Sequence, residues 1–223
     1  MGYVNAFLVD GAELTLVDVG LPGLTRTFLK AIRDAGRNPE DLRHIAVTHH
    51  HADHTGSLAP LAAKVPNATV YAHPLDIPVI TGDKPIPGPN PASALGKVLG
   101  PLVMRMQPSR LEHVDVQRPV EDDAEIPAAG GMRVIHTPGH TAGHISFLKP
   151  GNGGVLFVGD AAANMFGRVG LPIGMFTEDM DQARASVRKI AELEFDAACF
   201  GHGTVITGKA HAAFRRWIEK QAS

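Results

Sequence analysis

The chain has little cysteine, few aromatic residues, almost no net charge and no long apolar run. Its 223 residues include one cysteine, Cys199, which excludes an intrachain disulfide framework and fits a reducing compartment. The formal net charge of -2 offers no attraction to nucleic acid or to anionic membranes. No stretch approaches the roughly 20 apolar residues of a membrane helix, and the N-terminus lacks the basic region of a signal peptide. We therefore expect a cytoplasmic protein with no nucleic-acid or membrane partner.

The composition is that of a folded globular protein. Hydrophobic residues make up 44% of the chain and charged residues 20%, and the length fits a single domain over residues 1–223. Strands and helices alternate, which predicts a mixed α/β fold with two sheets and outer helices. The predicted strands are Val4–Val9, Leu14–Val19, His44–Thr48, Thr69–Ala72, Met132–Thr137, Ile145–Leu148, Val155–Val158 and Ala197–Phe200. The predicted helices are Leu24–Ala35, Ser57–Lys64, Asp179–Leu193 and Lys209–Gln221.

A proline-rich insertion from Pro74 to Pro119 interrupts this alternation. It holds nine of the 17 prolines, and four of them alternate with other residues from Pro85 to Pro91, which predicts no regular helix or sheet. Within it, Ala94–Met106 has the apolar spacing of a helix, weakened by two glycines and a proline. Two interpretations stay open: an irregular excursion over the surface, or a lid or wall of a binding pocket.

Four of the chain's 12 histidines, with one aspartate, fall within residues 49–54. On an extended chain, residues two apart share a face, so His49 and His51 point together and His50 points away. Asp53 and His54 then lie near the start of a helical segment. Imidazoles and a carboxylate in one small volume are the ligand set that suits zinc, iron or similar metals. The motif predicts a metal site.

Three further segments each place one polar side chain of the same kinds at the end of a predicted strand. His140 lies in a turn-rich loop after one strand, Asp160 ends a second, and His202 follows a third. Neighbouring glycines permit tight backbone geometry at each position. We expect these side chains to complete the metal site.

In this order the motifs His-x-His-x-Asp-His, Gly-His, Gly-Asp and Gly-His-Gly resemble the metallo-β-lactamase fold superfamily, in particular its glyoxalase II-like and lactonase-like hydrolases. The resemblance covers nearly the whole chain, including Leu16–Gly20. It implies a four-layer αββα sandwich with the metals at one edge between the sheets. Members usually have one more strand before Val4–Val9; either that strand is dispensable here or the recorded start is late.

The resemblance also implies a site with two divalent metal ions, zinc in the first place and iron or manganese as alternatives. One metal would be bound by His49, His51 and His140, the other by Asp53, His54 and His202, with Asp160 bridging them. Such a pair shares a water and makes hydroxide available near neutral pH. We expect this metal-bridged hydroxide to attack a small ester, lactone or thioester, while Asp53 orients it and carries a proton to the leaving group.

Two other functions remain as alternatives. Persulfide dioxygenases of the same superfamily share the motif and use a single iron, so the chain could be a redox enzyme. A non-catalytic metal-binding module is the second.

Within the hydrolases no named activity fits, because β-lactamases lack a bridging aspartate, glyoxalase II enzymes carry a helical C-terminal domain, and lactonases place a tyrosine shortly after the bridging aspartate. Here Ala161–Asn164 follow Asp160, and the tyrosines are Tyr3 and Tyr71.

The surroundings of the site give a few more expectations. The apolar, glycine-rich segment Met165–Phe176 either packs on the core or joins Leu95–Met106 around an apolar pocket suited to an acyl chain, a lactone or a thioester. The proline-rich insertion and the terminal helix offer apolar surface for a homodimer. We expect Asp18 to orient a ligand histidine, His144 to have a structural role and Cys199 to be a buried small hydrophobe. His73 either ends its strand without contacting a ligand or lines the pocket.

Overall fold

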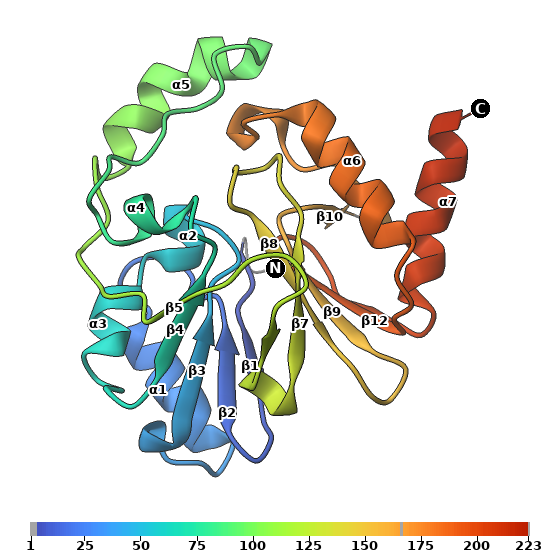
Figure 1. Ribbon diagram of the computed structural model, residues 1–223. Coiled ribbons are helices and arrows are strands. Elements are labelled where there is room, and N and C mark those ends of the chain that lie inside the picture. The colour runs from blue at the N-terminus through green and yellow to red at the C-terminus, as the bar shows by residue number, and fades with distance from the viewer. Residues whose placement is uncertain (1–3, 166, 223) are drawn as a thin grey trace.

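Two β-sheets packed face to face form the centre of the protein, and helices cover the outer face of each sheet (Figure 1). The computed structural model describes residues 4–165 and 167–222, so Tyr3 and Phe166 lie outside the described residues. The order of layers, helix, sheet, sheet, helix, is the four-layer arrangement that the sequence predicts.

The first sheet contains five strands in the order β1-β2-β3-β4-β5, and the second contains six in the order β13-β12-β9-β8-β7-β6. A separate two-stranded hairpin is formed by β10 and β11. The strands of the first sheet are β1 (Phe7–Val9), β2 (Leu14–Val17), β3 (Leu42–Ala46), β4 (Thr69–Ala72) and β5 (Arg118–Pro119). Those of the second sheet and the hairpin are β6 (Glu125–Ile126), β7 (Met132–His136), β8 (Ile145–Lys149), β9 (Val155–Gly159), β10 (Ala163–Met165), β11 (Arg168–Gly170), β12 (Ala197–Phe200) and β13 (Ile206–Thr207).

Helices α1 and α3 lie against the outer face of the first sheet, and α6 and α7 against that of the second (Figure 1). The helices are α1 (Thr25–Asp34), α2 (Ala52–Thr55), α3 (Leu58–Ala62), α4 (Ile77–Ile80), α5 (Ala94–Met106), α6 (Met180–Ala191) and α7 (Ala210–Ala222). Single 3₁₀ turns are η1 (Pro39–Asp41), η2 (Ala128–Gly130) and η3 (Gly174–Phe176). No helix in the described part of the chain has both the length and the apolar character needed to cross a membrane.

Alternation along the strands explains the layers, because successive side chains enter different apolar clusters. In β9, Leu156 and Val158 pack toward α6 and α7, whereas Phe157 packs between the sheets. In β12, Cys199 likewise lies between the sheets, 8% exposed, and burial raises the pKa of its thiol to about 11. Its expected role as a small buried hydrophobe agrees with this position.

The proline-rich insertion is more regular than the sequence predicts. Residues 85–91 form neither helix nor strand, as expected, but α4, α5 and β5 all lie within the insertion. Pro78 falls in the first turn of α4, where a backbone N–H is not needed. In α5, Ser93 caps the first turn by accepting from the N–H of Gly96. A Cβ at Gly96 would lie 2.2 Å from the carbonyl oxygen of Asn90, so this glycine permits the close packing that holds the helix.

Phe147 tests the packing between the two sheets. Its side chain in β8 is fully buried in the cluster between them. Replacing it with alanine leaves a cavity there, and Phe147→Ala is expected to lower the free energy of unfolding by about 3–5 kcal/mol. Urea unfolding measures this change. Val98→Ala, at a side chain that is 75% exposed, is the control and should stay within about 0.5 kcal/mol of the parent protein; a similar loss in both variants would contradict this account of the core.

Candidate metal centre

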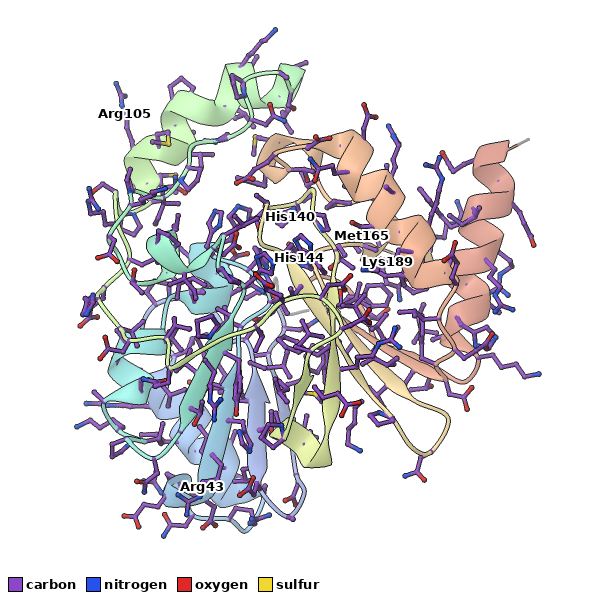
Figure 2. All side chains as sticks on the ribbon, viewed as in Figure 1. Arg43, Arg105, His140, His144, Met165 and Lys189 are labelled. Atoms are coloured by element: carbon purple, nitrogen blue, oxygen red, sulfur yellow. The ribbon has the colours of Figure 1, made fainter. Side chains whose placement is uncertain are left out.

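All seven residues predicted to bind metal lie together at one edge of the sandwich, where several strands of both sheets end. The first histidines follow β3 and continue into α2, while the others follow β9 and β12 or lie in the turn between β7 and β8. Figure 2 shows His140 and His144 at this edge, beneath the start of α6. The seven residues are His49, His51, Asp53, His54, His140, Asp160 and His202.

The side chains form two triads with a shared carboxylate. In each triad the possible ligand atoms lie within 4.8 Å of one another: His49, His51 and His140 form one, and Asp53, His54 and His202 the other. Asp160 lies between them, because its oxygens are 3.4 Å from Nε2 of His140, 3.5 Å from Nε2 of His54 and 3.2 Å from Nε2 of His202. The arrangement can hold metal ions in either triad or in both.

Hydrogen bonds on the far side of the rings decide which nitrogen of each histidine faces the site. Nδ1 of His54 lies 2.8 Å from Oδ2 of Asp18, so it carries the proton and donates it to the carboxylate. The hydroxyl of Thr48 donates to the same Asp18 oxygen and accepts from Nδ1 of His49 at 3.0 Å. Both rings therefore direct the lone pair of Nε2 into the site. The expectation that Asp18 orients a ligand histidine agrees with these contacts.

His140 is oriented in the same way from the other sheet. The hydroxyl of Thr177 donates to the carbonyl oxygen of Ile173 and accepts from Nδ1 of His140 at 3.2 Å. Nε2 of His140 then faces the site, 2.9 Å from Nδ1 of His51. A metal ion between these two nitrogens would separate and satisfy both.

Three buried atoms test whether the site fits a metal. Nε2 of His49, Nε2 of His54 and Oδ1 of Asp160 are buried without a hydrogen-bond partner among the described residues. Leaving such a group unpaired costs about 1–3 kcal/mol, which a metal bond would offset. A Cβ at Gly201 would lie 2.1 Å from Oδ1 of Asp160, so glycine there keeps the space beside the ligands open. The residues present fit divalent metal ions.

The charges of the site favour a cation. Burial lowers the pKa of His51 to about 3, and it also lowers the pKa of His140 well below its usual range. Burial acts against ionisation of Asp53 as well, but the hydrogen bond from His202 and the charge of His54 lower its pKa to about 2. Although burial lowers the pKa of His54, the charges of Asp160 and Asp18 raise it to about 9. The negative potential that favours a proton on His54 also favours a metal ion at that nitrogen.

Three further histidines lie near the triads without belonging to them. His144 is fully buried, and its Nε2 accepts a hydrogen bond from the backbone N–H of Asp160 at 2.9 Å. Its Nδ1 donates to the hydroxyl of Thr137 at 2.8 Å. The structural role expected of His144 agrees with these bonds. His50 lies outside both triads, as expected, and His73 stacks on His136 at 4.3 Å instead of lining the cavity beside the site.

Sequence reasoning missed Asp76, which joins the two loops that carry the first triad. Its carboxylate is 2% exposed and accepts from the backbone N–H of His50 at 2.9 Å. On the other loop it accepts from the hydroxyl of Thr141 at 2.7 Å and from the N–H of Gly143 at 2.8 Å. Burial raises its pKa, but the contact with His50 prevails and lowers it to about 2. The sequence feature that could have indicated Asp76 is its position shortly after the strand β4.

A cavity of about 580 Å³ opens beside the triads, and His51, Asp53, His140, Asp160 and His202 contribute to its lining. One wall comes from the proline-rich insertion, including Ile86, Pro89 and Val103. The insertion is therefore a pocket wall, the second of the two interpretations above. Another part of the lining comes from the segment after Asp160, including Met165, Leu171, Pro172, Ile173 and Phe176. Val169 and Met175 of the same segment are buried, so this segment both packs on the core and lines the cavity.

One family model matches most of the chain. The model described as the metallo-beta-lactamase superfamily covers residues 1–202. The chain belongs to this superfamily. The predicted resemblance and the αββα fold are thereby confirmed.

Individual superfamily members agree with this assignment. The chain is 31% identical to the probable metallo-hydrolase YflN of Bacillus subtilis, over 88% of this chain and 78% of that protein. It is 33% identical to a hydroxyacylglutathione hydrolase of Halorhodospira halophila over 71% of its length, but covers only 46% of that relative. A metallo-beta-lactamase family protein from Thermus thermophilus shares the fold, with a TM-score of 0.69 and 24% identity over 98% of this chain and 75% of that one.

Replacing Asp76 tests how the superfamily site is held in this chain. Asp76→Ala leaves buried N–H groups on both ligand loops unpaired, so we expect zinc affinity to fall about 10–100-fold. Titration of metal-depleted protein with Zn²⁺ against a competing chelator measures the change. Asp76→Asn keeps one acceptor oxygen and should lose less, and the exposed Asp34→Ala should lose nothing. Unchanged affinity in Asp76→Ala would show that the loops hold their ligands independently of this carboxylate.

Proposed function

We propose that the protein is a metal-dependent hydrolase that cleaves small carboxylic esters, lactones or thioesters, with two divalent ions, zinc in the first place. The observation that carries this proposal is the pair of triads around Asp160, which opens onto a cavity large enough for a small organic substrate. Relatives described as a metallo-hydrolase and as a hydroxyacylglutathione hydrolase support the same reaction class.

In this proposal each triad holds one ion. His49, His51 and His140 would hold the first ion, and for His49 and His140 the nitrogen left for it is Nε2, because Nδ1 of each ring contacts a threonine hydroxyl. Asp53, His54 and His202 would hold the second, with Asp160 placed between the two triads. When bound, the ions supply a Lewis acid for the carbonyl oxygen and a water whose pKa is lowered toward neutrality.

Asp53 is the proposed catalytic residue. Its side chain is 35% exposed, lines the cavity and lies 3.3 Å from Nε2 of His202. From this position the carboxylate orients the attacking water and accepts its proton, which then passes to the leaving group. The reaction adds one water: a C–O bond forms at the acyl carbon, the bond to the leaving oxygen or sulfur breaks, and a carboxylic acid and an alcohol or thiol result.

Metal content measured on protein purified without added metal tests the proposal first. We expect two divalent ions per chain, zinc in the first place. The protein should hydrolyse carboxylic ester, lactone or thioester substrates and should not hydrolyse phosphodiesters. Removal of the ions by a chelator should abolish turnover, and adding Zn²⁺ back should restore it. A single iron together with oxygen uptake on glutathione persulfide would instead identify a redox enzyme. Occupied ligands without turnover on any ester would identify a metal-binding module.

The role of Asp53 is tested by Asp53→Ala with metal content followed in parallel. Loss of the positioned carboxylate is expected to lower kcat by about 10²–10⁴-fold even in the fraction of protein that retains its metals. The control is Asp115→Ala, at a side chain that is 86% exposed and paired with His113. Retained turnover in metal-loaded Asp53→Ala would remove Asp53 from the mechanism.

A further inference from the structure

The walls of the cavity beside the triads are apolar and are fixed to one another. Asn90 of the proline-rich insertion donates its backbone N–H to the carbonyl oxygen of Met175 at 2.8 Å. Its side-chain amide donates to the carbonyl oxygen of Thr177 at 2.6 Å. These bonds join the insertion to η3, which also carries Phe176 into the cavity. The side chains of Val103 and Phe176 thus line the cavity from two segments that hold each other in place.

The charge of this lining is one-sided. None of the described residues that line the cavity is a lysine or an arginine. Three of the described lining residues carry carboxylates: Asp53 and Asp160, which are proposed metal ligands, and Glu178, which is not. A substrate with carboxylates of its own, such as a glutathione thioester, would lose water around them without gaining a cation from these walls. Carboxylates of a substrate that lie away from the two proposed ions therefore gain no ion pair from these walls.

Several apolar side chains around the cavity remain open to solvent. Leu21 is 47% exposed, Met165 53% and Ile173 56%, and all three are lining residues. Exposed apolar side chains grouped at a concave site are typical of ligand contacts. Each methylene group of a ligand that leaves water against such a surface favours binding by about fourfold.

The two sides of the site differ, which sets the direction of the substrate. Asp53, the proposed proton carrier, lies beside His202, so the leaving group faces that side. The η3 wall adjoins His140 instead, since Thr177 accepts from Nδ1 of His140 and Glu178 donates its backbone N–H to the carbonyl oxygen of His140. The acyl half of the substrate then faces Ile173, Phe176 and Val103.

We infer that the substrate carries an uncharged aliphatic acyl chain, which binds between α5 and η3 and against Val103 in particular. This inference rests on the proposed hydrolase function and narrows it to neutral fatty-acyl esters or thioesters. Val103 is a specificity-determining residue, because it lines the cavity from α5 and belongs to neither triad.

A matched pair of valines on one helix tests the inference. Val103 lines the cavity, while Val98 on the same helix is 75% exposed and is absent from the lining. The zinc-loaded wild-type protein should hydrolyse p-nitrophenyl octanoate with a higher kcat/KM than p-nitrophenyl acetate. It should also hydrolyse a thioester of octanoic acid faster than S-lactoylglutathione. Val103→Trp should lower kcat/KM for the octanoate by about tenfold or more, with the acetate nearly unchanged. Val98→Trp should leave both unchanged.

The outcomes separate the two levels of the proposal. Absence of hydrolysis on every ester and thioester would overturn the hydrolase and the acyl-chain inference together. Hydrolysis with no dependence on acyl length, a preference for S-lactoylglutathione, or equal losses in the two tryptophan variants would overturn the acyl-chain inference alone. Val103→Leu, which adds only one methylene group, replaces Val103→Trp in this test if the tryptophan variant does not fold. It should give a smaller loss on the octanoate, in the same direction.

Discussion

The carboxylate of Asp18 is the contact on which the geometry of the candidate metal centre depends. It accepts three hydrogen bonds of 2.8 Å, from the backbone and hydroxyl of Thr48 and from Nδ1 of His54. To make them, Asp18 adopts a left-handed conformation with a φ of 58° while it is 3% exposed. Such a backbone costs about 1–3 kcal/mol and persists only where surrounding contacts define it. Through this one side chain, the end of β2 sets the orientation of His54 directly and of His49 through Thr48.

The second sheet completes the site by equally short connections. The backbone N–H of Ile145 donates to the carbonyl oxygen of Thr48, so the start of β8 is tied to the strand that leads into the histidine motif. His144 holds the backbone of Asp160, and Thr177 holds the ring of His140. Three of the predicted ligand histidines are therefore held in orientation by groups outside both triads, which is the condition for a preorganised metal centre.

Much of the fold and most of the site were predictable because their signals are local. His49 and His51 are two residues apart on extended chain, Asp160 directly follows one apolar strand, and His202 lies two residues after another. Asp76 was not predictable in this way, since its partners are 26, 65 and 67 residues away and only the tertiary fold brings them together. Helix α5 was underestimated for a related reason: local propensity counts Gly96 as a weakness, whereas the packed structure uses its missing side chain. The cavity walls are likewise a product of packing between distant segments.

The predicted metal ligands and most of the other residues that line the cavity lie in different segments of the chain. The predicted ligands lie where strands of both sheets end, whereas much of the remaining cavity lining comes from the insertion around Asn90 and from the segment around η3. Substitutions of lining side chains that contact no predicted ligand, such as Val103, can thus alter which molecule fits without moving a ligand. A scaffold divided in this way allows new substrates to be acquired over evolution while the reaction chemistry stays constant.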